Sequence, residues 1–375
     1  MINQANTIYE IRYDFDLGGE EITIPEGCVL KFEGGSFRNG NINGGLVLNV
    51  PNKPIFYNLG LSNIKFINNT TPESFGAIGD GSTDDTESLR YAIYYSSLLG
   101  VKLVCIPKIK YRITNSLNYY NNTYYDVKLN VYGEQYRSLS DAHLENRKTF
   151  LIDTNVKLFK NSTIQGIIKN CDFTTVEWGD DDSSMFDNCI LKAFIFDNNN
   201  VDRLNSFMNN TSVRIVSYIK NNRIVSRYFS KVTAECGGLV GLVDSYIINN
   251  YITGETNDNI NNYCFGWNEY NAATISNNFI DFFKIIYSPQ LSNTVQTVLS
   301  IGNQYQVFKY FYPSDNMYED KECTIKLHNC GINSIGDSFN WLDPDSLDYL
   351  KKLTPYYIKR PIESTETNES ELEII

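Results

Sequence analysis

The densest group of residues that could carry out a chemical reaction is a short acidic segment around Trp178. It contains Glu177, Asp180 and Asp182. Glycoside hydrolysis needs two carboxyl groups flanking the scissile bond, roughly 6.5–9.5 Å apart in inverting enzymes. Asp180 and Asp182 would point the same way on an extended chain, about 6–7 Å apart. The pattern makes Glu177, Asp180 and Asp182 candidate catalytic carboxylates, and Trp178 a candidate surface for stacking a sugar ring.

Two other interpretations of this acidic segment stay open. Adjacent aspartates are common in solvated turns, where they do no chemistry. Clustered carboxylates can also form a weak site for a hard cation such as Ca²⁺. We weigh these two against catalysis, and we assign neither a metal nor a cofactor to the chain.

A second cluster combines aromatic and hydrogen-bonding side chains. Trp267, Glu269 and Tyr270 stand beside Asn268 and Asn271. Flat amphipathic rings next to amides suit a glycan ligand, so the first three residues are candidate glycan-binding residues. The alternative is that the rings fill the core or a subunit interface.

Composition and charge exclude several classes of partner. The chain has 375 residues and a formal charge of −12, and Asn clusters and 27 Tyr favour strands and turns over helices. An acidic chain is poorly suited to nucleic acid or an anionic membrane. The sequence has neither a signal-peptide pattern at its start nor an apolar run of the roughly 18 residues needed for membrane insertion. We therefore expect synthesis in a cytoplasm without signal-directed export.

A loose repeat runs from about residue 150 to 335. Short β-like runs meet Asn-containing pairs in KNCDFTTV at 169, DNCILKAF at 187, KNNRIVS at 220, INNYITG at 248, SNNFIDF at 276 and IGNQYQVF at 301. Asn tolerates the left-handed turn conformation, and equivalent residues of successive parallel coils stack. The repeat predicts coils with one recurring turn site, and it predicts that Cys171, Cys189 and Cys330 are stacked, reduced core thiols.

One helix is expected, near residues 83–99. Asp84 and Glu87 have the spacing of a capping box, and Gly100 supplies the stop. Four residues share one face and should be buried: Leu89, Ala92, Ile93 and Ser96.

The segment before this helix carries the strongest resemblance. FGAIGDGSTDDT at 75–86, followed by VCIP at 104–107 and YRI at 111–113, resembles the opening of the pectate-lyase-like β-helix superfamily. The resemblance implies an all-β fold, a right-handed parallel β-helix (solenoid) with an N-terminal capping helix. It also implies N-terminal β coils or an attachment region at 1–71, the helix-capped β-helix at 72–340, and a C-terminal cap with an acidic tail at 341–375.

The early segment IPEGCVLKFEGGSFRNGNI is similar to β-helix proteins of gut Bacteroidota and their phages. This similarity implies a phage tail-spike or tail-fibre protein of the virion, with homotrimers, other tail proteins and bacterial surface polysaccharide as partners. The polygalacturonase motifs are missing, since neither His143 nor His328 lies between glycines and Val216 follows Arg214-Ile215. We therefore expect recognition of host glycan, with a polysaccharide depolymerase or a purely structural virion component as alternatives.

Overall fold

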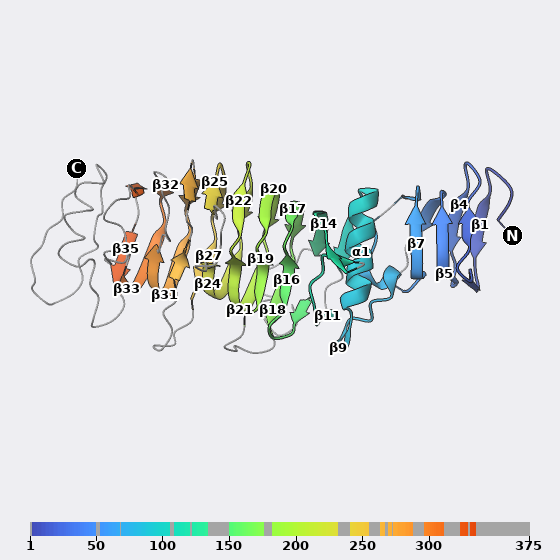
Figure 1. Cartoon of the computed structure of the whole chain (residues 1–375), viewed down its shortest axis with the longest axis horizontal. Helices are drawn as coiled ribbons and strands as arrows, with labels where there is room; N and C mark the ends of the chain where they lie inside the picture. The colour runs from blue at the N-terminus through green and yellow to red at the C-terminus, as the bar shows by residue number, and fades with distance from the viewer. Residues whose placement is uncertain are drawn as a thin grey trace, which may run out of the picture. The chain divides into compact units, whose positions relative to one another are not determined.

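The computed structural model is a right-handed parallel β-helix of about nine turns, which confirms the expected fold class (Figure 1). The chain forms two compact units, one built from residues 1–153 and 166–173 and the other from 154–165 and the residues from 174 onward. The structure describes residues 2–49, 53–67, 69–105, 109–120, 122–133, 150–175, 182–231, 241–254, 263–266, 269–271, 273–287, 296–310, 323–328 and 331–334. The expected C-terminal cap and tail at 341–375 lie outside these residues.

The first unit opens with small parallel coils. One sheet has the order β1 (Ile8–Ile11), β4 (Val29–Phe32), β6 (Leu46–Asn49) and β8 (Lys65–Phe66). In the other sheet, β5 (Ser36–Asn43) pairs with β2 (Asp14–Asp16), β3 (Glu21–Thr23) and β7 (Phe56–Ser62). The core between them is aromatic, with Phe32 packed edge-on against Phe37 and Phe56.

Helix α1 (Thr86–Leu99) lies between β7 and β14 (Val127–Gly133) in Figure 1. It packs on η1 (Pro72–Phe75), β10 (Leu103–Cys105), β11 (Lys110–Ile113) and β14. The predicted apolar face is confirmed because Leu89, Ala92, Ile93 and Ser96 are all buried. The predicted stop is also confirmed, with Gly100 in the left-handed conformation at φ 67°.

The predicted cap residue is wrong by one position. Asp84 ends strand β9 (Asp80–Asp84), whose backbone pairs with β11, so the helix starts later and Asp85 is its N-cap. The buried Asp85 carboxylate accepts the N–H groups of Ile78 and Gly79 at 2.7 and 3.1 Å. Glu87 does not complete a capping box but forms an ion pair with Arg90. The aspartates of this segment therefore fix the turn into the helix.

Strand β15 (Phe150–Ile152) pairs in parallel with β11 and continues the coils of the first unit. The same unit also contains a separate antiparallel hairpin, formed by β12 (Tyr119–Tyr120) and β13 (Thr123–Tyr124). Strands β17 (Thr163–Lys169) and β18 (Asp172–Thr175) contain points where the chain passes between the two units.

The second unit has two long parallel sheets. The first runs β20 (Ile190–Asp197), β23 (Tyr218–Lys220), β26 (Tyr246–Ile248), β30 (Ala273–Ser276), β32 (Gln296–Ile301) and β34 (Cys323–His328). The second runs β21 (Asn200–Asn209), β24 (Arg223–Lys231), β27 (Tyr251–Thr253), β31 (Phe279–Tyr287), β33 (Gln304–Tyr310) and β35 (Gly331–Ser334). Shorter strands complete the coils: β16 (Lys157–Lys160), β19 (Ser184–Asp187), β22 (Ser212–Arg214), β25 (Gly241–Val243), β28 (Tyr263–Phe265) and β29 (Glu269–Asn271).

Asparagine makes the corner between the two long sheets. The first residue of each pair adopts a positive φ, at Asn198, Asn221, Asn249, Asn277 and Gly302. The second residue is buried, and the five second residues form a ladder along the axis: Asn199, Asn222, Asn250, Asn278 and Asn303. The predicted turn function of asparagine is confirmed here.

The prediction of a single turn site needs correction. Asn188 and Asn210 also have positive φ, but they lie at a different corner, at the ends of β19 and β21. Cys189 belongs to that corner, whereas Cys171 lies between β17 and β18. Both thiols are buried, as predicted, but they do not occupy one row. Cys330 lies outside the described residues.

Candidate functional site

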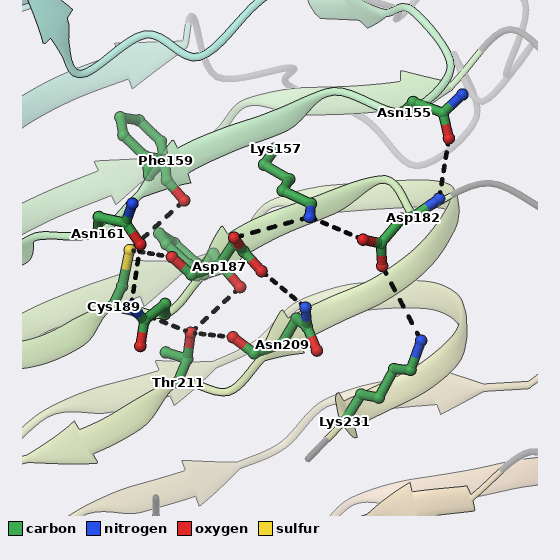
Figure 2. A network of polar contacts seen from close by, with 12 residues as sticks. Asn155, Lys157, Phe159, Asn161, Asp182, Asp187, Cys189, Asn209, Thr211 and Lys231 are labelled. Atoms are coloured by element: carbon green, nitrogen blue, oxygen red, sulfur yellow. Dashed lines mark hydrogen bonds and ion pairs between the residues drawn. The ribbon is translucent and has the colours of Figure 1, made fainter. Parts of the chain in front are cut away.

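Asp182 is the one predicted catalytic residue that the structure describes, and it lies in an ion-pair network (Figure 2). Its carboxylate lies 2.7 Å from the Lys157 ammonium and 3.9 Å from that of Lys231. Its backbone N–H donates to Asn155 Oδ1 at 3.1 Å. The Asp182 side chain is 54% exposed, whereas the two lysines are 23% and 26% exposed. Asp182 is thus a surface carboxylate held by two partly buried cations.

Beneath this surface the network continues to Asp187, at the end of β19. Lys157 Nζ is 3.9 Å from the Asp187 carboxylate, and Asn209 Nδ2 donates to that carboxylate at 2.6 Å. Asp187 and Asn209 are 5% exposed each, and Asn209 Oδ1 is buried without a hydrogen-bond partner. Figure 2 shows the groups as one continuous chain of contacts from Lys231 through Asp182 and Lys157 to Asp187.

The other residues of the first predicted cluster lie outside the described residues. These are Glu177, Trp178 and Asp180, so the proposed pairing of Asp180 with Asp182 stays a prediction. In the second cluster Trp267 also lies outside the described residues. The backbones of Glu269 and Tyr270 are in β29, in register with Gly241 and Leu242 of β25.

A second surface lies along the asparagine corner of the second unit. It comprises Tyr218, Lys220, Asn221, Arg223, Tyr246, Asn249, Tyr251, Asn277 and Phe279, and we call it the corner surface. The register places Tyr218 beside Tyr246 on one side of the corner and Tyr251 beside Phe279 on the other. Each pair of rings is stacked, at 4.8 Å and 10° for the first and 5.3 Å and 3° for the second.

Polar groups lie between the two stacked pairs. Asn221, Asn249 and Asn277 are exposed, because the turn directs the first residue of each corner pair outward while the second enters the ladder. Arg223 of β24 lies opposite Tyr251 of β27 in the strand register. Its side chain is 42% exposed and donates to Asn200 Oδ1 at 3.1 Å. The corner surface therefore offers flat rings, amides and cations together, with Tyr251 40% exposed.

Four arginines lie on β21, β22 and β24. Three of them are partly exposed: Arg203, Arg214 and Arg223. Arg227 is instead buried, with 7% exposure.

No protein-family model matches this chain, and neither a curated protein nor a solved structure is detectably similar to it.

The described residues contain no group of three His, Cys, Asp or Glu side chains arranged to hold a metal ion. Among the same residues, no helix is long and apolar enough to cross a membrane.

Sequence reasoning missed the corner surface and both lysines. A local signal existed for the corner: a Tyr lies three residues before Asn221 and Asn249, and a Tyr or Phe lies directly after Asn250 and Asn278. Lys157 and Lys231 had no such signal, because only the coil stacking brings these distant residues to one carboxylate.

Proposed function

We propose that the protein is a phage tail-spike or tail-fibre component that binds bacterial surface polysaccharide through its corner surface. The observation that carries the proposal is the exposed Tyr251 ring stacked parallel to Phe279, with exposed asparagine amides beside it. Aromatic rings bind the apolar face of a sugar, and amides and guanidinium groups hydrogen-bond its hydroxyls.

The repetitive geometry also supports a polymeric ligand. Equivalent groups recur in successive coils, so the same combination of ring and amide is presented several times along the helix axis. A polysaccharide with repeating units can contact several coils at once, and linked weak contacts give a higher overall affinity than one contact alone. The virion location and the homotrimer are proposals that rest on the sequence resemblance alone.

The test is affinity electrophoresis through gels cast with purified bacterial capsular polysaccharides. The wild-type protein should be retarded by a subset of the polymers. Tyr251→Ala should reduce the retardation about tenfold, since a central aromatic contact is worth more than about 1 kcal/mol in a binding surface. Tyr57→Ala is a matched control, because Tyr57 is 42% exposed but lies in the first unit.

The same polymers distinguish binding from cleavage. If new reducing ends or unsaturated sugars accumulate, the protein is a depolymerase. If no polymer retards the protein, and the purified protein neither binds host cells nor blocks phage adsorption, glycan recognition is wrong and the structural alternative gains support.

A further inference from the structure

We propose that the exposed turn formed by Ile215 and Val216 is a docking site for the acidic segment 363–375 of this chain. The turn lies in the second unit, between β22 and β23. The segment lies outside the described residues, so its sequence alone supplies its charge and its apolar residues. The interaction does not depend on glycan binding at the corner surface.

The backbone of this turn is unusual for the residues that form it. Ile215 and Val216 have φ 51° and 49°, a left-handed conformation that β-branched residues rarely adopt. Ala193 donates its backbone N–H to Ile215 O, Val216 donates to Asp244 O, and both partners are also left-handed. These four residues form one row across neighbouring coils, which we call the left-handed row. Elsewhere in the described part of the chain, this conformation is confined to Asn, Gly and Arg203.

The left-handed row also exposes two large apolar side chains. Ile215 is 49% exposed and Val216 is 53% exposed. The backbone conformation is unfavourable for both residues, and their exposed side chains gain little from burial to offset that cost. Asparagine, which forms most of the other turns, would avoid both disadvantages. Strained residues of this kind are typical of binding surfaces, so the pair indicates a partner that covers it.

Two cations border the apolar pair. Lys192 and Arg214 lie opposite each other in the register of β20 and β22, and they directly precede Ala193 and Ile215 in the chain. Lys192 is exposed and Arg214 is half-buried. Two like charges opposite each other on a sheet repel, and an acidic ligand reduces that repulsion. The exposed Asp244 of the left-handed row opposes an acidic ligand, but these three groups together carry a net positive charge.

The segment 363–375 has the matching composition. It contains five glutamates and neither Lys nor Arg, and it includes the sequence ELEII at 371–375. On an extended strand this alternation places Leu372 and Ile374 on one face and the adjacent glutamates on the other. The apolar face can then cover Ile215 and Val216 while the long glutamate side chains reach the bordering cations.

The segment can also reach the turn. The strand order from β23 through β26, β30 and β32 to β34 has four steps of about 4.8 Å, or about 20 Å in all. Residues 335–362 separate β35 from the segment in the sequence, and an extended chain spans about 3.3 Å per residue. This stretch is long enough for the chain to supply its own ligand.

The experiment is cross-linking of the full chain with a water-soluble carbodiimide, which joins a lysine amine to a carboxylate in direct contact. Peptide mass spectrometry should find Lys192 joined to a glutamate of residues 363–375. Lys65 is the internal control, because it is also exposed but lies in the first unit. Lys192 should form at least about threefold more of these links than Lys65, since docking holds its ion pair together.

Two variants test the apolar contact. Ile215→Asn removes one apolar side chain and keeps the turn, since asparagine tolerates the left-handed conformation. It should lower the yield of Lys192 links about threefold, the effect of losing part of one buried side chain. The double variant Leu372→Ser with Ile374→Ser keeps every charge of the segment and should lower the yield similarly. Tyr251→Ala changes only the corner surface and should leave the yield unchanged.

Three results would each overturn the docking site. The first is the absence of links between Lys192 and residues 363–375 in the wild-type protein. The second is an equal yield at Lys192 and Lys65, which would show unspecific attraction of the acidic segment to any exposed lysine. The third is an unchanged yield in Ile215→Asn, which would show that the apolar turn takes no part.

Discussion

Asn250 donates its side-chain amide to Asn278 Oδ1 at 2.9 Å, and its backbone N–H donates to the same oxygen at 2.8 Å. The second amide hydrogen of Asn250 goes to Ile219 O at 2.8 Å. Its own Oδ1 accepts two bonds from Asn222. Every hydrogen-bonding position of this buried side chain is therefore used, and removal of one asparagine affects two neighbouring coils.

Asn250→Ala should destabilise the second unit strongly. The substitution removes the acceptor of the Asn222 backbone N–H and of one of its side-chain N–H groups, and each buried donor left without a partner costs about 1–3 kcal/mol. We expect a loss of at least about 2 kcal/mol in the free energy of unfolding, measured by urea denaturation followed by tyrosine fluorescence.

The control is Asn249→Gly at the adjacent exposed position. Asn249 has φ 56°, a conformation that glycine adopts freely, and its side chain makes only a 3.4 Å contact with Asn221. Its stability should stay within about 0.5 kcal/mol of wild type. Equal losses in the free energy of unfolding for the two variants would mean that the buried ladder asparagine contributes no more to stability than the exposed one.

The fold could be predicted from sequence because its signals are local. The FGAIGDGSTDDT segment and the Asn pairs each determine their own turn. The coil alignment could not be predicted, because successive ladder asparagines are separated by 23, 28, 28 and 25 residues. Loops of variable length therefore hide which strands stack.

The unpredictable coil alignment also explains why the contacts of the candidate site could not be predicted from the sequence. Asp182 was found as a member of an acidic segment, but its lysine partners lie 25 residues before it and 49 residues after it. An asparagine followed by Cys also looks alike at either corner, so Asn188 could not be separated from the corner-surface row. Only the paired strands tell these corners apart.

Val216 is a strained position whose replacement should stabilise the protein. It has φ 49°, which is unfavourable for a β-branched residue, and it is 53% exposed. Left-handed backbone costs an ordinary residue about 1–2 kcal/mol, and asparagine tolerates it better. Val216→Asn should therefore raise the free energy of unfolding by about 0.5–1 kcal/mol in the same denaturation assay.

The comparison variant is Ile190→Asn, at a residue that is 44% exposed and lies within β20. Asparagine is unfavourable in strands, so this variant should be less stable than wild type. A stabilising effect at both positions would point to reduced surface hydrophobicity and not to relief of backbone strain.

The buried thiols should be unreactive in the folded protein. Burial raises the pKa of Cys105, Cys171 and Cys264 well above the usual thiol range, and it raises the pKa of Cys189 to about 12. Since the thiolate is the reactive form, iodoacetamide at pH 8 should label these four cysteines only after denaturation. Peptide mass spectrometry resolves each site, and rapid native labelling of Cys189 would show that its corner opens readily.

Asp80 should make stability depend on pH below the neutral range. Its pKa is lowered because its carboxylate accepts the N–H groups of Thr83 and Ser82 and the Thr83 hydroxyl. Ionised Asp80 therefore stabilises the folded state above its unfolded pKa of about 3.9, and this contribution is lost as the pH falls through the folded pKa. Asp80→Asn cannot ionise, so it should be less stable than wild type at pH 7 and the difference should shrink toward pH 2. Denaturation of both proteins at several pH values measures this difference in the free energy of unfolding. A difference that does not change with pH would show that the hydrogen bonds of Asp80 stabilise the turn without any contribution from its charge.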